Sequence, residues 1–278
     1  MASMAKNNAA TATSRLASWR VWVQSAFLLA WLDPWLLRLH SVCGPVFHCY
    51  SCPLATFACP IGVLANFSAL HMIPFVTLGI LALVGAAFGS LVCGWACPFG
   101  FLQDLIARAP TRKFTLPLWA GWFRYVVLAV FVIAIPYVWG EGNKYFFCRL
   151  CPAGAIEAAL PATVQASMAA GTIVWPTTLK ITILVLILAA MFFVWRPWCT
   201  LFCPLGAIYG LLNHVSFFFL RFHPDRCLDC SKCHSLCKRG GSPEGQVDSL
   251  HCVRCMECTD CSSVTLENYF TAAAKPGD

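Results

Sequence analysis

The sequence predicts an all-α polytopic membrane domain of about four spans with an internal twofold repeat, followed by a small, cysteine-rich α+β domain. Three observations lead to this fold class. Of the 278 residues, 59% are hydrophobic and only 11% are charged, whereas soluble globular domains have roughly 25% charged residues. The apolar residues gather in long runs, and the 18 cysteines recur at short metal-ligand spacings. Such spacings favour metal or cluster binding over the disulfide scaffold of a small secreted protein.

The basic residues are distributed as expected of a membrane protein. The net charge is +7, but the 19 Lys and Arg residues lie in segments between apolar runs. A nucleic-acid-binding protein would gather them along one face. We therefore expect no nucleic-acid partner, and we interpret the basic residues as a topological signal.

Four segments approach the roughly 20 apolar residues that a membrane-spanning helix needs. They are residues 19–37, 71–92, 119–139 and 179–195. Asp33 and Pro34 interrupt the first segment, which we interpret as an uncleaved signal anchor. Residues 156–176 and 205–222 are apolar but broken by Pro, Gly, Asn or His, and we expect interfacial or re-entrant helices there.

The Lys and Arg residues also predict how the spans are oriented. With the N-terminus inside, the far side of the membrane keeps only Arg38, Lys144, Arg149 and Lys180. All other basic residues then lie on the cytoplasmic side. This bias predicts a multi-pass protein of the cell inner (cytoplasmic) membrane with both termini in the cytoplasm.

A tetrapeptide, Cys-Pro-x-Gly, occurs four times in the predicted membrane domain. The copies begin at Cys59, Cys97, Cys151 and Cys203. Each copy follows another cysteine, and these are Cys52, Cys93, Cys148 and Cys199 in the same order. The Cys93/Cys97 pair lies 106 residues before the Cys199/Cys203 pair. The order of pairs and spans therefore indicates an internal duplication.

The predicted topology sorts these pairs into two sets of four. The inner set, after spans that exit to the cytoplasm, is Cys93, Cys97, Cys199 and Cys203. The outer set, in the opposite loops, is Cys52, Cys59, Cys148 and Cys151. Four thiolates are what a [4Fe–4S] cluster requires, so one or two clusters are expected here. Small inert thiols, or disulfides in the outer set, are the alternative.

The proline after each of these cysteines predicts where helices begin. Proline suits the first turn of a helix, where its missing N–H has no partner in any case. The ligand cysteines would then lie at helix N-termini, where the helix dipole favours a negatively charged thiolate.

Two cysteine runs follow the last apolar segment. The first is Cys227, Cys230, Cys233 and Cys237 with C-x2-C-x2-C-x3-C spacing, and the second is Cys252, Cys255, Cys258 and Cys261. The first spacing is that of bacterial two-cluster ferredoxins, in which the fourth cysteine ligates the other cluster. Cross-ligation predicts a first C-terminal set of Cys227, Cys230, Cys233 and Cys261 and a second C-terminal set of Cys252, Cys255, Cys258 and Cys237.

The second run departs from this pattern. It ends in C-x2-C, and neither run has a proline after its last cysteine. Zinc is the competing ligand, because paired C-x2-C motifs also bind it. Cys43 and Cys49 remain outside all four sets, and either could exchange roles with Cys52 or form a disulfide.

These motifs divide the chain into four predicted parts. They are a cytoplasmic tail (residues 1–18), the membrane domain (19–222), a ferredoxin-like 4Fe–4S domain (223–266) and a flexible tail (267–278).

The sequence resembles polytopic 4Fe–4S membrane proteins, a family that includes the NapH-type quinol dehydrogenase subunits and the C-terminal half of NosR. The resemblance rests on Cys93-Gly-Trp-Ala-Cys97-Pro, on Cys199-Thr-Leu-Phe-Cys203-Pro-Leu-Gly and on the two later cysteine runs. It implies electron transfer between the quinone pool and other redox subunits, with a haem or flavin protein on the far face or a cytoplasmic oxidoreductase as partner. The extra far-side pairs resemble a separate branch.

A quinone site is the least defined prediction. Tyr209, Asn213 and His214 follow the inner cysteines and are our candidates to line it. The predicted function is an electron-transfer subunit of an oxidoreductase complex. The alternative is a membrane redox sensor or a maturation factor that uses the same clusters.

Overall fold

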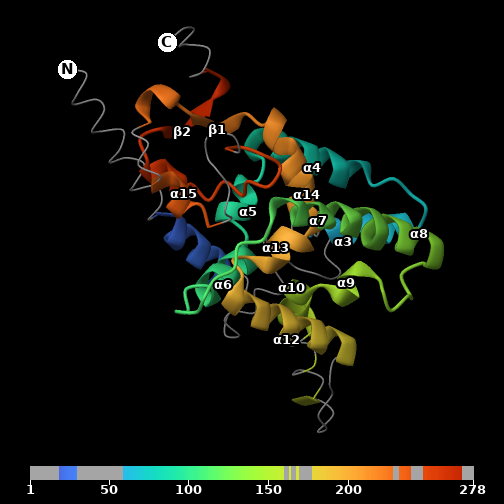
Figure 1. Ribbon diagram of the computed structural model, residues 1–278. Coiled ribbons are helices and arrows are strands. Elements are labelled where there is room, and N and C mark those ends of the chain that lie inside the picture. The colour runs from blue at the N-terminus through green and yellow to red at the C-terminus, as the bar shows by residue number, and fades with distance from the viewer. Residues whose placement is uncertain are drawn as a thin grey trace.

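The computed structural model describes residues 19–29, 59–159, 163, 167–168, 177–227, 232–238 and 247–270. Helices dominate these parts of the chain, and a small sheet and the cysteine runs lie at the end away from α12 (Figure 1). From residue 60 to residue 215, and apart from the stretch 118–139, the described helices are α3 (Pro60–Ala69), α4 (Phe75–Phe88), α5 (Leu91–Trp95), α6 (Pro98–Ile106), α9 (Phe147–Leu150), α10 (Pro152–Gly154), η4 (Ala155–Ala159), α12 (Thr178–Phe193), α13 (Pro197–Leu201), α14 (Pro204–Leu212) and η5 (Asn213–Val215).

One helical stretch, Leu118–Trp139, is 22 residues long and apolar enough to cross a membrane by length and composition. It consists of η2 (Leu118–Trp122), α7 (Phe123–Val127), η3 (Leu128–Ala134) and α8 (Ile135–Trp139). The η3 segment is π-helical and directly precedes α8, whose second residue is Pro136. Proline lacks the N–H of a regular turn, and a π-helical turn is one way to accommodate it.

Two other expected spans form shorter helices. Helix α4 has 14 residues and ends at Gly89, whose φ of 55° stops the helix. Helix α12 has 16 residues and ends at Val194, which is extended and bridges Phe114. Of the first expected span, residues 19–29 are described and are helical. The number of membrane spans therefore stays a prediction.

These helices turn large apolar side chains outward. Val76 and Leu83 on α4, Val138 on α8 and Leu186 on α12 are all more than half exposed. A surface this apolar is unusual for a protein surrounded by water.

All four Cys-Pro-x-Gly motifs begin helices, as predicted. The cysteine is the N-cap and the proline the first helical residue in α3, α6, α10 and α14. The proline ring fixes the φ angle that the first turn requires. The prediction about helix starts is confirmed.

The main apolar core joins the two halves of the repeat. Val132 of η3 and Met191 of α12 are fully buried in it. Cys148 belongs to this core, and Cys59, Cys97, Cys151 and Cys203 pack against it. Cysteines that the sequence assigned to opposite membrane faces thus line one core.

The C-terminal part contains both helices and strands. Strands β1 (Phe218–Phe222) and β2 (Val264–Asn268) pair antiparallel, with Phe218 opposite Asn268 and Phe222 opposite Val264. Between them lie η6 (Pro224–Arg226), α15 (Lys232–Leu236) and η7 (Glu257–Asp260). The expectation of a helix through residues 205–222 is wrong beyond η5, because the backbone of β1 pairs with a strand far along the chain.

Candidate iron–sulfur site

The inner set is brought together from both halves of the repeat. The Cys97 Sγ accepts a hydrogen bond from the Gly100 N–H, 3.3 Å away, inside its own motif. The Cys199 Sγ accepts one from Nε2 of Gln103, 3.0 Å away. Gln103 lies on α6, in the other half of the repeat, and it is fully buried. All four thiols of the set lie within electrostatic reach of one another.

Burial destabilises the thiolate form of these cysteines when no cation is bound to them. Desolvation, reinforced by the neighbouring Cys199, raises the pKa of the Cys97 thiol to about 12. Burial likewise raises the pKa of Cys93 and Cys203 well above the usual range. Four buried negative charges become tolerable only beside positive charge. An iron cluster supplies that charge, so the donor set fits a [4Fe–4S] group.

Two buried arginines flank the inner set. Arg196 donates from Nη1 to the Cys93 carbonyl at 3.0 Å, and it pairs with both carboxylate oxygens of Asp104 at 2.8 and 2.6 Å. Its guanidinium is fully buried. Arg124 on α7 is equally buried and lies within electrostatic reach of Cys93.

The glycine of the motif makes room for these arginines. A Cβ added to Gly100 would lie 3.4 Å from Nη1 of Arg196, and one added to Gly206 would lie 3.8 Å from Nη1 of Arg124. Gly100 and Gly206 occupy the same place in Cys97-Pro-Phe-Gly and Cys203-Pro-Leu-Gly. Each inner motif thus faces one guanidinium. In the sequence, both arginines counted only toward the Lys and Arg bias that predicts membrane topology.

Three of the four outer-set cysteines are described, and they lie together. A Cβ added to Gly62 would lie 3.5 Å from the Cys148 Sγ and 3.7 Å from the Cys59 Sγ. Burial raises the pKa of Cys148 to about 12 and that of Cys151 to about 11. Lys180 lies within electrostatic reach of both thiols, and its Nζ donates to the Cys148 carbonyl at 3.4 Å. The small residue at Gly62 leaves space beside these sulfurs, which suits a bound cluster.

The fourth outer cysteine, Cys52, lies outside the described residues, as does Cys230 of the first C-terminal set. The other members of that set, Cys227, Cys233 and Cys261, lie within electrostatic reach of one another around Cys233. In the second C-terminal set, Cys258 lies within electrostatic reach of Cys255, Cys252 and Cys237. The described members of each expected C-terminal set thus lie near one another, and the cross-ligation itself stays a prediction.

In the described parts of the chain, no three His, Cys, Asp or Glu side chains lie close enough to hold a single metal ion.

The loop that carries Cys252 and Cys255 is hydrogen-bonded onto the helices that carry the inner set. The fully buried Arg254 donates to the Phe88 carbonyl at 3.0 Å and to the Asn213 carbonyl at 2.9 Å. The Ser90 hydroxyl donates to the Cys252 carbonyl at 2.7 Å. These bonds fix the second C-terminal set against the inner set.

A chain of charges makes a second connection between the same parts. Arg20, on the helix of residues 19–29, pairs with Asp104 at 2.5 Å and with Glu257 at 2.9 Å. Its Nε also donates to the Gly94 carbonyl at 3.1 Å. Asp104 is shared with Arg196, so the network runs from the inner set to the C-terminal loop. Sequence reasoning missed it, because its members are far apart in the chain.

The three residues proposed to line a quinone site have other surroundings. Asn213 is buried, and its side chain accepts from the Ser90 N–H at 2.8 Å and donates to the Ser249 and Cys252 carbonyls. Tyr209 is buried near Cys93, and both this thiol and desolvation raise the pKa of its hydroxyl. His214 is exposed. Two cavities lie among the described helices and loops, and none of the three residues lines either of them. Their role toward quinone stays a prediction.

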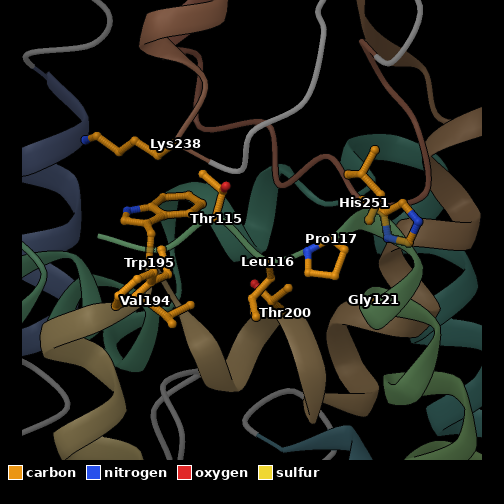
Figure 2. A pocket seen from close by; sticks show the side chains of 11 residues that line it. Thr115, Leu116, Pro117, Gly121, Val194, Trp195, Thr200, Lys238 and His251 are labelled. Carbon is orange, nitrogen blue, oxygen red and sulfur yellow. The ribbon is translucent and has the colours of Figure 1, made fainter. Parts of the chain in front are cut away.

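One of these cavities holds little more than a water molecule. It has a volume of about 20 Å³ and lies between the segment Thr115–Pro117, Trp195, Lys238 and His251 (Figure 2). The other is entirely apolar and larger, about 330 Å³. Its lining includes Phe147 and Leu150, next to outer-set cysteines, and Trp198 and Phe202, next to inner-set cysteines.

Comparison with known proteins gives three matches to a 4Fe-4S binding domain, at residues 70–117, 121–160 and 177–224. The first and third have equal length and hold the two inner pairs, and the second holds Cys148 and Cys151. This finding supports both the iron–sulfur prediction and the internal repeat.

Curated relatives point the same way. The chain is 25% identical to the ferredoxin-type protein NapH of Haemophilus influenzae over 68% of the chain and 61% of NapH. It is 26% identical to YccM of Escherichia coli, named as a candidate electron transport protein, over 63% of the chain and 48% of YccM. The uncharacterized protein MJ0750 of Methanocaldococcus jannaschii is 27% identical over 78% of the chain and 88% of its own length. These relatives support a ferredoxin-type, NapH-like family. No solved structure matches the chain.

Proposed function

We propose that this protein is an integral inner-membrane iron–sulfur protein that relays electrons between its C-terminal clusters and the quinone pool or a redox partner on the opposite face. A bound [4Fe–4S] cluster supplies reversible one-electron transfer. The names of NapH and YccM, which describe ferredoxin-type and electron transport proteins, support this role.

The observation that carries the proposal is the docking of the second C-terminal set onto the inner set. Arg254, Asn213 and Ser90 join the two through partly buried hydrogen bonds. A sensor domain that must move needs a contact that opens easily, whereas electron transfer benefits from fixed donor and acceptor positions. The chain's own residues here hold the loop of Cys252 against the helices of the inner set.

The apolar surface supports membrane insertion. Leu118–Trp139 has the length and composition of a span, and α4 and α12 expose large aliphatic side chains. Lipid is the solvent that such a surface suits. We propose four spans with both termini cytoplasmic, and a haem or flavin protein on the far face or a cytoplasmic oxidoreductase as redox partner.

Quinone binding is a further part of the proposal. The apolar cavity of about 330 Å³ touches side chains that adjoin both the inner and outer sets. Its volume lies at the lower end of the range for small-molecule sites. An isoprenoid quinone tail suits its wholly apolar lining, with Tyr209 and His214 as candidate head-group contacts outside it.

Iron and sulfide analysis of the anaerobically purified protein, combined with EPR, tests the proposal. Four sets of four cysteines predict about sixteen iron atoms per chain. A value near eight would remove the membrane-domain clusters. Stoichiometric zinc without visible charge-transfer absorption would overturn the whole proposal. Clusters that stay in one redox state during quinol oxidation in native membranes would favour the sensor or maturation-factor alternative.

A further inference from the structure

Arg124 is a buried cation that lacks a carboxylate partner among the described residues. Its residue exposure is 1%. The Nη2 group donates to the Leu250 carbonyl and, at 3.4 Å, to the Tyr125 hydroxyl, and the guanidinium lies 5.2 Å from the Tyr125 ring. Its Nε has no hydrogen-bond partner in the described structure. All of these contacts are neutral, so none compensates the charge.

The other buried arginines in this region are compensated. Arg196 pairs with Asp104, and Arg254 pairs with Asp248 at 2.5 Å. Removing one partner of a buried ion pair is strongly destabilising because it leaves a bare charge in a low dielectric. The buried charge of Arg124 therefore destabilises the fold unless an anion lies nearby.

The inner set lies beside Arg124 and becomes negatively charged when its thiols lose their protons to ligate iron. Arg124 is electrostatically coupled to Cys93, and its Nη1 lies close to Gly206, in the motif that begins with Cys203. A cubane held by four thiolates is an anion overall, and its net charge is one of the factors that set its potential. The pairing therefore becomes complete only when the cluster is present.

We propose that Arg124 is the counter-charge of an inner-set cluster, and that it raises the reduction potential of this cluster relative to a neutral residue at the same place. The inference rests on the proposed iron–sulfur function. A cation at fixed distance favours the reduced state, because one-electron reduction adds a negative charge that the cation stabilises. Arg124 is a positioning residue, and through the Leu250 carbonyl it also holds the loop that carries Cys252.

An EPR-monitored redox titration of the purified full-length protein tests the proposal. Arg124→Gln should shift the midpoint of the inner-set signal to lower potential, whereas Arg124→Lys should keep it near the wild-type value. The control is Arg112→Gln, which removes the same charge from an exposed position, where solvent screens it. An unchanged midpoint in Arg124→Gln, with full iron content, overturns the proposal.

A stability cycle keeps the proposal testable if Arg124→Gln loses its cluster. Arg124→Gln and Cys97→Ser are combined, and thermal unfolding of all four proteins is compared. In the protein that holds the cluster, Arg124→Gln should destabilise. In the Cys97→Ser background it should be neutral or stabilising, because a bare buried charge is removed. Equal destabilisation in both backgrounds overturns the proposal. Absence of iron from the wild-type protein would instead overturn the proposed function.

Discussion

The ring of Phe147 lies 6.3 Å from the ring of Trp198, measured between centroids. Phe147 precedes Cys148 of the outer set, and Trp198 precedes Cys199 of the inner set. Trp198 also stacks on Phe202, the neighbour of Cys203, at 5.5 Å. A membrane core of about 30 Å would separate clusters at opposite interfaces. The ring contact instead joins residues next to both cysteine sets within one apolar core.

Trp198 should be a major contributor to stability, because it is buried between these rings. Trp198→Ala is expected to lower the free energy of unfolding by about 3–5 kcal/mol, since it opens a cavity. Chemical unfolding of the purified protein measures the change. Trp119→Ala is the control, because Trp119 is 75% exposed. Equal losses for the two variants would contradict the role of Trp198 in joining the sets.

Cys97 and Cys203 should belong to one cluster. Cys97→Ser and Cys203→Ser are each expected to abolish the same EPR signal, because the fold groups both thiols with Cys93 and Cys199. The signal of the outer set should survive both changes and should be lost instead in Cys151→Ser. If the Cys97 and Cys203 variants lose different signals, each pair completes a separate cluster.

Gly94 is required for docking of the C-terminal loop. A Cβ at Gly94 would lie 2.5 Å from the Val253 carbonyl and 2.9 Å from the Arg254 carbonyl. Gly94→Ala is therefore expected to cost about 1–3 kcal/mol and to speed proteolysis after Lys238. Gly79→Ala is the matched control, since nothing lies within 4 Å of its added Cβ. Identical proteolysis of both variants would show that the loop tolerates the change.

Iron loading should release protons. In the iron-free protein, burial raises the pKa of Cys97 and Cys148 to about 12, so both thiols are neutral at pH 7. A thiol must lose its proton to ligate iron. Loading is therefore favoured as pH rises and opposed as pH falls. Anaerobic reconstitution in a pH-stat should release close to one proton per ligating cysteine, and absence of release would contradict the assignment.

The proposed topology predicts opposite locations for two loops. Reporter fusions after Pro110 and after Gly142, on either side of the helical stretch Leu118–Trp139, should report the cytoplasm and the far side respectively. The same location for both would overturn the span assignment.

The sequence by itself determined the local chemistry. The spacing of the cysteines predicted the four thiol sets, and the proline in each Cys-Pro-x-Gly motif predicted the helix starts that the structure has. Both features depend on residues only a few positions apart. The cysteines of one motif ligate the same cluster, and the first turn of a helix involves consecutive residues.

Only the tertiary structure decided which distant residues share a site. The strand at Phe218–Phe222 depends on a partner at Val264–Asn268, so residues that looked helical locally became a sheet. Asn213 was a candidate quinone residue, but the fold turns its side chain to the Ser90 N–H and the Cys252 carbonyl. Arg124 looked like a loop charge until packing buried it without a carboxylate. Burial and long-range pairing set the energies of these groups, and neither can be read from local spacing.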